Sequence, residues 1–204
     1  MIKTFITAVS LQSRNGLLKV EYEPKDFCLN WNKPTSFPII PVIASNKEDG
    51  EKVQVIVIRP VSKNASDNFE KLMEELKALG VTGEMVKELP VEGNKGKKES
   101  IRLLLKLLDE IPEDSLIYAD ITFNTKPMSA MVLYAMNFVE KMKDTEVDGI
   151  YYGEIVWEEK SPDSLPPAYL YDLTSFKYLS DAAEQLSDLG ITDLRKALET
   201  LVEM

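Results

Sequence analysis

The sequence of 204 residues predicts an α/β fold, a Rossmann-like three-layer domain built on a mainly parallel sheet. Three observations lead to this prediction. Short apolar runs rich in β-branched residues recur along the chain, as expected of strands buried on both faces. Segments of ten or more residues with helical spacing lie between these runs. Each helix-like segment connects one strand-like run to the next, and this order is the one that right-handed β-α-β crossovers need.

The first half of the chain predicts three core strands, a hairpin-like excursion and one clear helix. Gly80 ends that helix, because glycine is the preferred residue just past a helix end. In order, the expected elements are a strand at Ile2–Val9, a strand at Leu18–Tyr22 within the excursion, a short helix at Phe37–Ser45, a strand at Val53–Ile58, a helix capped by Ser66 or Asp67 and running to Leu79, and a strand at Glu84–Val91.

The second half continues the alternation and then becomes helical. Its expected elements are a helix at Glu99–Glu110 with Ile101, Leu104, Leu105 and Leu108 inward, a strand at Leu116–Asp120, a helix at Pro127–Met142, a strand at Val147–Gly153, an edge strand at Tyr169–Leu173, and two helices separated near Gly190. The Pro127 helix is apolar nearly all round, which is typical of a helix packed deep against a sheet or into a subunit contact. We expect residues 1–173 to form the Rossmann-like domain and residues 174–204 to form a helical extension.

Composition excludes several classes of function. The net charge of -10 repels a phosphate backbone, so we expect no binding to duplex nucleic acid. The chain has no histidine, which removes the usual general base and the usual zinc ligand. With Cys28 as its only cysteine and no apolar span, the chain is expected to be cytoplasmic, with no membrane contact. We expect neither metal nor cofactor, because the dinucleotide and Walker glycine spacings are both missing.

A ligand site is expected where the parallel strands end, since open α/β sheets bind ligands at the carboxyl ends of their strands. Hydroxyl, amide and ammonium groups gather there next to a helix N-terminus, and this combination favours an anionic ligand. The residues expected to line the site are Ser10, Leu11 and Gln12 after the first strand, Arg59 after the strand at Val53–Ile58, and Asp120, Thr122, Phe123, Asn124, Thr125, Lys126 and Pro127 after the strand at Leu116–Asp120.

Two of these features have a plainer interpretation. The stretch from Ser115 to Lys126 could be a helix cap followed by a solvated turn, although a cap needs only one of its five polar residues. The lysines at 95, 97 and 98 are better explained as a solvated charged loop than as a phosphate loop, since GNKGKKES does not fit the Walker pattern.

The segments DITFNTKPMSAMVLYAMNFVEKM and VDGIYYGEI resemble CARF domains, the ligand-sensing Rossmann-like modules of type III CRISPR systems. The resemblance extends back through VQVIVI and LPV and forward to YLYDLTSFKYLSDAAEQLSDLG, so it covers most of residues 1–190. It is loosest in the excursion at residues 11–45.

The resemblance implies a homodimer that binds a cyclic oligoadenylate across its twofold axis as a sensor in antiviral signalling. Cyclic tetra-adenylate is the commonest ligand of such domains, and cyclic hexa-adenylate is the usual alternative. Ser10, Leu11 and Gln12 match the first ligand loop, and residues 122–126 match the second, whose basic residue meets the phosphates. Either an effector domain is missing from this chain or the domain acts alone.

A second function uses the same residues. The domain could be a ring nuclease that opens the cyclic ligand without metal, in which Lys126, Thr125, Asn124 and Ser10 would be catalytic. A third alternative is a Rossmann-like domain for another nucleotide. The sequence leaves the choice between them open.

Overall fold

The computed structural model describes residues 1–13, 16–92, 96–157, 165–188, 193 and 195. The chain divides into two compact units, Met1–Asp172 and Leu173–Met204. The first unit is an α/β domain, and the second contains the helix α5 (Thr174–Asp188). None of the helices in the described ranges is both long enough and apolar enough to cross a membrane.

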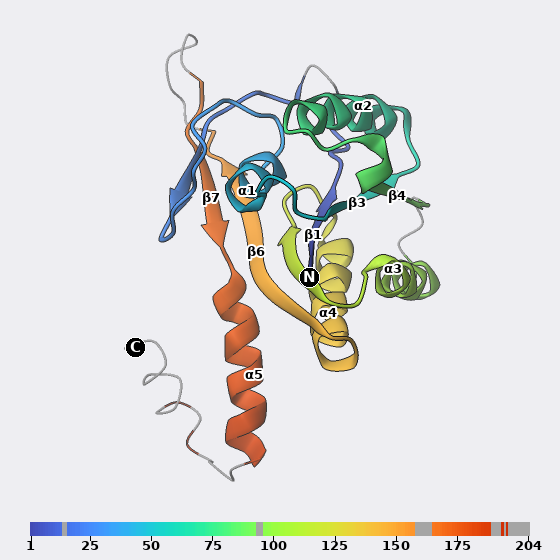
Figure 1. Ribbon diagram of the computed structural model, residues 1–204, viewed down its shortest axis with the longest axis vertical. Coiled ribbons are helices and arrows are strands. Elements are labelled where there is room, and N and C mark those ends of the chain that lie inside the picture. Colours follow the sequence, from blue (N-terminus) through green and yellow to red (C-terminus); the bar gives the residue numbers. More distant parts are fainter. Residues whose placement is uncertain (14–15, 93–95, 158–164, 189–192, 194, 196–204) are drawn as a thin grey trace. The chain divides into compact units, whose positions relative to one another are not determined.

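One sheet of seven strands organises the first unit, in the order β2-β7-β6-β5-β1-β3-β4 (Figure 1). Neighbouring strands are parallel except for the antiparallel pair β6 and β7. The strands are β1 (Ile2–Ala8), β2 (Tyr22–Lys25), β3 (Val53–Pro60), β4 (Val86–Val91), β5 (Ser115–Asp120), β6 (Thr145–Ile155) and β7 (Ala168–Asp172). The five consecutive strands β4-β3-β1-β5-β6 follow the Rossmann order, so the predicted fold class is confirmed.

Helices cover both faces of the sheet and make the domain three-layered. They are α1 (Ile39–Asn46), α2 (Lys63–Ala78), α3 (Lys97–Glu110) and α4 (Lys126–Met142). The helices α1 and α2 lie on one face, while α3 and α4 lie together on the other (Figure 1). This arrangement follows from the strands, because β3 buries Val55, Ile56, Val57 and Ile58 completely and therefore needs cover on both faces.

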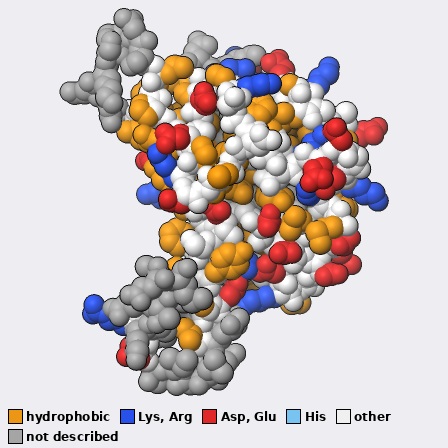
Figure 2. Space-filling model, turned by 60° about the vertical axis from the view of Figure 1, so that its left-hand side comes forward, with side chains coloured by type: hydrophobic (Ala, Val, Ile, Leu, Met, Phe, Trp, Pro, Cys, Tyr) orange, Lys and Arg blue, Asp and Glu red, His pale blue; other side chains and the backbone are white. Residues whose placement is uncertain are grey.

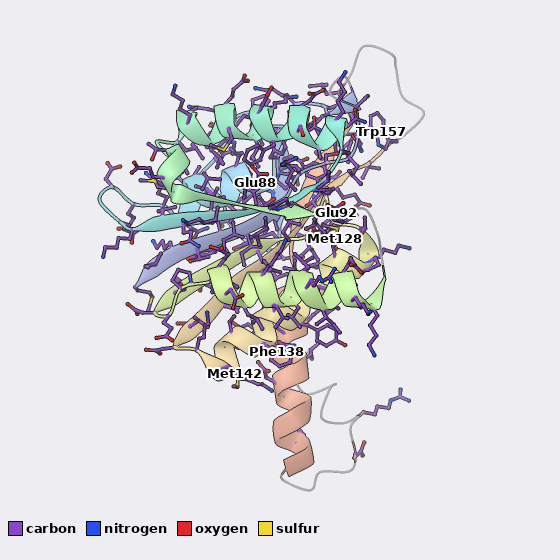
Figure 3. The ribbon with its side chains drawn as sticks, turned by 90° about the vertical axis from the view of Figure 1, so that its right-hand side faces the viewer. Glu88, Glu92, Met128, Phe138, Met142 and Trp157 are labelled. Atoms are coloured by element: carbon purple, nitrogen blue, oxygen red, sulfur yellow. The ribbon has the colours of Figure 1, made fainter. Side chains whose placement is uncertain are left out.

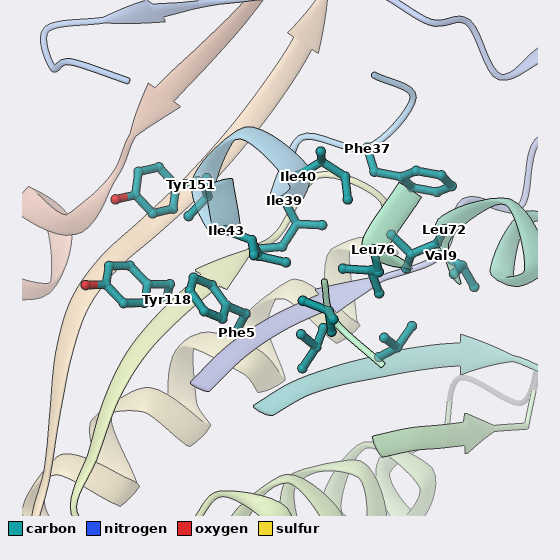
Figure 4. Packing of buried hydrophobic residues seen from close by; sticks show 14 of the residues in the cluster. Phe5, Val9, Phe37, Ile39, Ile40, Ile43, Leu72, Leu76, Tyr118 and Tyr151 are labelled. Carbon is teal, nitrogen blue, oxygen red and sulfur yellow. The ribbon is translucent and has the colours of Figure 1, made fainter. Parts of the chain in front are cut away.

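The largest core cluster lies between the sheet and the α1–α2 layer (Figure 4). Phe5 of β1 stacks on Tyr118 of β5 with ring centroids 5.0 Å apart. Leu72 and Leu76 of α2 are fully buried in the same cluster. Burying one such side chain stabilises a fold by roughly 1.5–3 kcal/mol, so this layer fixes α2 and the loop that precedes it.

Four predicted elements of the first half begin elsewhere in the structure. The helix expected from Phe37 begins at Ile39. The strand expected at Leu18–Tyr22 is wrong, since only Val20 forms an isolated bridge and β2 begins at Tyr22. The helix α2 begins four residues earlier than predicted because the Oγ atom of Ser62 accepts a hydrogen bond from the Ala65 amide, 3.2 Å away. The strand predicted from Glu84 starts at Val86, after a short 3-10 turn.

The inward face predicted for α3 is also partly wrong. Ile101 and Leu105 are 45% and 54% exposed, whereas Leu103 and Leu107 are buried. The six apolar residues of the segment spread over more than half of the helix circumference, so spacing alone does not select which part of that arc is buried, and packing against α4 decides it. Packing likewise places β7 between β2 and β6 instead of at the edge. The second C-terminal helix, predicted after Gly190, falls almost entirely outside the described residues.

Candidate functional site

The carboxyl ends of β1 and β5 meet where the strand order reverses. After an excursion through the edge strand β2 and helix α1, the chain continues from β1 to β3 and β4 on one side, and it then returns through α3 to β5 on the other side. In an open α/β sheet this switch point is the ligand-binding crevice. The loop after β1, residues 9–13, and the loop after β5, residues 121–125, both start here, as the sequence predicted.

Asp120 ties the β5 loop to its neighbours. Its carboxylate is fully buried, and its Oδ2 atom accepts a hydrogen bond of 2.8 Å from the Thr7 hydroxyl. The amide and hydroxyl of Thr122 both donate to Oδ1, and the Thr122 oxygen in turn accepts from the Gly153 amide at 2.7 Å. Asp120 therefore joins β1, β5 and β6 and holds the loop in place, with no oxygen turned toward solvent.

Burial also changes the titration of this carboxyl group. Loss of water around Asp120 raises its pKa above the usual value, and the hydrogen bonds from Thr122 and Thr7 oppose part of that shift. No cation among the described residues balances the carboxylate, so its charged form depends on these three donors.

The following residues leave polar atoms unused. The side-chain nitrogen and oxygen of Asn124 and the hydroxyl of Thr125 are buried, and no described group bonds to them. Lys126 is exposed and has no partner within the described ranges, while Pro127 fixes the first turn of α4. Buried polar atoms are almost always paired with protein, water or ligand. Three consecutive residues therefore carry polar groups that the described part of the protein leaves unpaired.

Phe123 anchors the middle of this loop. Its ring packs edge-on against Phe37, with centroids 6.1 Å apart, at the border of the main core cluster. The packing of Phe123 against the core therefore fixes the position of the loop and keeps Asn124 and Thr125 next to the start of α4.

The loop after β1 is held by a residue that the sequence analysis missed. The side-chain amide of Asn68 donates to the carbonyl oxygens of Ser10 and Gln12, at 2.8 and 2.9 Å. Ser10 itself is buried, and its hydroxyl accepts from the Gln12 amide at 3.1 Å, whereas Leu11 is 45% exposed. A signal for Asn68 existed, because it lies four residues before the buried Leu72 on the apolar face of α2.

The other predicted cations are placed differently. The guanidinium of Arg59 pairs with Glu88, at 2.6 and 2.5 Å, and donates to the Ser66 hydroxyl at 3.1 Å. Its charge is therefore compensated within the protein. Of the predicted lysine loop, Lys95 lies outside the described residues, and Lys97 and Lys98 are exposed on the first turn of α3.

Two pockets flank the β5 loop. The first, called here the rim pocket, lies at the ends of β1, β3 and β4, has a volume of about 160 Å³, and includes Thr125 and Pro127 in its wall. The second has a volume of about 270 Å³ and lies toward β6, with Thr122 and Phe123 in its wall. Leu11 lines the first pocket and Gln12 the second, so both loops separate the two hollows.

Fold and site together define a Rossmann-like α/β domain whose polar loops meet at the switch point of the sheet. No group of three or more potential metal-binding side chains occurs in the part of the chain that the structure describes. No protein-family model matches the sequence, and no curated protein matches it.

Among solved structures, the chain is similar to Csm6 from Enterococcus italicus bound to cyclic hexa-2'-fluoro-hexa-dAMP, with a TM-score of 0.45 and 9% sequence identity. The similarity covers 100% of this chain and 49% of that one, so this chain spans about half the length of that protein.

Proposed function

We propose that two copies of this chain bind one cyclic oligoadenylate, with cyclic tetra-adenylate as the preferred ring, and act as a sensor in type III CRISPR signalling. The observation that carries the proposal is the β5 loop at the switch point of the sheet, where Asn124, Thr125 and Lys126 have polar groups without partners among the described residues. The resemblance of residues 120–142 to CARF domains supports the same ligand. A sensor of this kind passes its signal to an effector.

Electrostatics favour a site shared between two chains. The chain has a net charge of -10, and acidic and basic side chains are interspersed over the described part of the face seen in Figure 2. One exposed Lys126 leaves most of the charge of four phosphates unmatched. Two copies supply two lysines and two α4 N-termini, and twofold symmetry presents them to the same ring.

The outer face of α4 supports a dimer. Tyr134, Phe138 and Met142 lie four residues apart on this helix and are 56%, 49% and 78% exposed, with Leu133 beside them at 37% (Figure 3 labels Phe138 and Met142). Because α4 begins at the β5 loop, parallel pairing of two such helices about a twofold axis brings both loops to the same end. The exposed apolar stripe would then be buried between the subunits.

Isothermal titration calorimetry with cyclic tetra-adenylate tests the proposal. We expect saturable binding with one ring for every two chains, and light scattering should give the mass of a dimer. Cyclic hexa-adenylate serves as the comparison ligand for ring size. Absence of heat with both rings would contradict the proposed ligand, and one ring per chain would contradict the shared site.

The unused donors of the β5 loop also favour a second function, cleavage of the bound ring. In this reaction a ribose 2′-hydroxyl loses its proton and attacks the neighbouring phosphorus. The bond from phosphorus to the 5′-oxygen breaks, that oxygen takes up a proton, and a 2′,3′-cyclic phosphate remains. Asn124 and Thr125 would orient the ribose, and Lys126 would stabilise the extra negative charge. Ser10, also predicted to take part, is buried and bonded within its own loop.

Chromatography of cyclic tetra-adenylate after incubation with excess protein in EDTA separates the two functions. Linear adenylates that end in a 2′,3′-cyclic phosphate are expected from a ring nuclease. Recovery of the intact ring would refute the proposed cleavage and would be consistent with the sensor function alone.

A further inference from the structure

The rim pocket combines an apolar interior with an acidic mouth. Its apolar wall comes from the ends of three strands, the starts of α2 and α4 and the middle of α3, and it includes Leu11, Val61, Leu103, Pro127, Met128 and Met131. Five residues with polar groups complete the lining: Ser62, Glu92, Glu99, Ser100 and Thr125. Figure 3 shows Glu92 at the end of β4 beside Met128 of α4.

The volume and the walls of this pocket suit a single small ring system. Its volume of about 160 Å³ is below the roughly 300–1,000 Å³ typical of pockets that take a drug-sized ligand. Leu11 and Val61 are 45% and 53% exposed, so covering them would remove apolar surface from water. Met128 and Met131 provide flexible, polarisable thioethers that adapt to the face of a ring.

The carboxylates of Glu92 and Glu99 determine which hydrogen-bonding groups a bound ring can carry at its edge. Glu99 already accepts a hydrogen bond of 2.7 Å from Arg102, whereas Glu92 has no partner among the described residues. An ionised carboxylate only accepts hydrogen bonds. The ring therefore has to offer an N–H donor toward Glu92, and a carbonyl oxygen at the same position would be repelled.

Thr125 joins this pocket to the proposed phosphate site. It lines the pocket with a buried hydroxyl that has no described partner, and it immediately precedes the exposed Lys126. A nucleotide whose phosphate lies near Lys126 thus has its base within reach of the rim pocket. The Thr125 hydroxyl is available to a ring nitrogen, whereas the Ser100 hydroxyl donates to the Gly96 carbonyl oxygen, 3.4 Å away.

We propose that the rim pocket of each chain holds one adenine of the cyclic oligoadenylate, and that Glu92 selects adenine by accepting a hydrogen bond from its exocyclic amine. This inference rests on the proposed function and adds to it a residue that determines base specificity. Hypoxanthine, the base of inosine, has a carbonyl in place of this amine and a hydrogen on N1, so its exocyclic group accepts a hydrogen bond where that of adenine donates one, and it serves as the probe.

The test compares the affinities of cyclic tetra-adenylate and cyclic tetra-inosinate for three proteins, namely the unaltered chain, Glu92→Gln and Glu74→Gln. The unaltered chain should prefer the adenylate by about 5- to 150-fold, the range expected when a bound ring covers the exposed Glu92 and leaves its carboxylate without a hydrogen-bond partner. In Glu92→Gln the new amide can donate to the hypoxanthine carbonyl, so the preference should fall by about fivefold or more. Glu74 is exposed on α2 outside the pocket, so Glu74→Gln makes the same change of charge and should keep the original preference.

The outcomes separate the two proposals. If the unaltered chain binds cyclic tetra-adenylate but does not distinguish it from the inosinate, or if Glu92→Gln keeps the full preference, the adenine pocket is refuted and the sensor remains. If no cyclic adenylate binds at all, the proposed function fails and this inference fails with it. If both Glu92→Gln and Glu74→Gln lose the preference for the adenylate over the inosinate, the preference depends on net charge and the proposed role of Glu92 is overturned.

Discussion

Arg59 and Lys126 are two cations at the same edge of one sheet, but only Arg59 forms an ion pair with a described residue. Arg59 is the last residue but one of β3, and its guanidinium pairs with Glu88 of the adjacent strand. The strand register explains this pair, because Arg59 lies opposite Pro90 and Glu88 is on the same face two residues earlier. Lys126 starts α4, where no described acid reaches it. A basic residue at the ligand-binding edge of the sheet is therefore not always free to bind an anion. Whether it is free depends on whether the neighbouring strand places an acidic side chain beside it.

Replacing each cation by alanine gives the sharpest test of this contrast. Lys126→Ala should weaken the binding of cyclic tetra-adenylate by about 10- to 150-fold, since hydrogen bonds to charged groups are worth about 1.5–3 kcal/mol. Arg59→Ala should change the affinity by less than about threefold, because its charge is already paired. Calorimetry on both variants measures this difference, with Lys77→Ala on the exposed end of α2 as the control. Equal losses for Arg59 and Lys126 would show that the ion pair opens on binding.

The loop that presents Lys126 depends on Asp120, so its removal should reduce stability. In Asp120→Ala, the donors of Thr7 and Thr122 lose their buried acceptor, which costs about 1–3 kcal/mol in the free energy of unfolding. Urea titration measures the loss. Asp120→Asn is the matched control, since it retains an oxygen for Thr122 and should unfold close to the original midpoint. An unchanged midpoint in the alanine variant would refute the anchoring role.

The raised pKa of Asp120 predicts a specific dependence of stability on pH. Burial keeps this carboxyl protonated in the folded state above the ordinary aspartate pKa of about 3.9, so the folded state binds more protons than the unfolded state over that range. The contribution of the Asp120 carboxyl to the free energy of unfolding is fully present below the ordinary pKa. It decreases as pH rises through the raised pKa of the folded state. The difference in unfolding free energy between the unaltered chain and Asp120→Asn should therefore fall as pH increases from 4. A difference that stays level or rises would show that the folded state does not favour the proton.

The smallest expected effect on stability comes from breaking the ion pair between Arg59 and Glu88. Glu88→Gln removes its anionic partner, and an exposed pair of this kind contributes about 0.2–1 kcal/mol to stability. Thermal unfolding should shift only slightly, while the affinity for an anionic ring should rise because a cation at the edge is freed. A fall in affinity would indicate that the ion pair itself helps to form the site.

Much of the fold was predictable because apolar periodicity reports burial directly. The strand at Val53–Ile58 is buried on both faces as its continuous apolar run indicated, and the proline at 127 correctly marked the first turn of α4. The failures occurred where the local signal was ambiguous. The segment of α3 is apolar on several sides, so only its contact with α4 places Ile101 and Leu105 at the surface.

The sequence by itself determined the α/β class, the polar loop after Asp120 and the exclusion of histidine chemistry, because these depend on residue type and on spacing along the chain. Only the tertiary structure decided that Asp120 is a buried anchor, that Asn68 holds the β1 loop and that Glu88 pairs with Arg59. These contacts join residues that are distant in sequence, and their geometry is set by strand register and helix packing. The availability of Lys126 and the acidic mouth of the rim pocket follow from the same long-range packing.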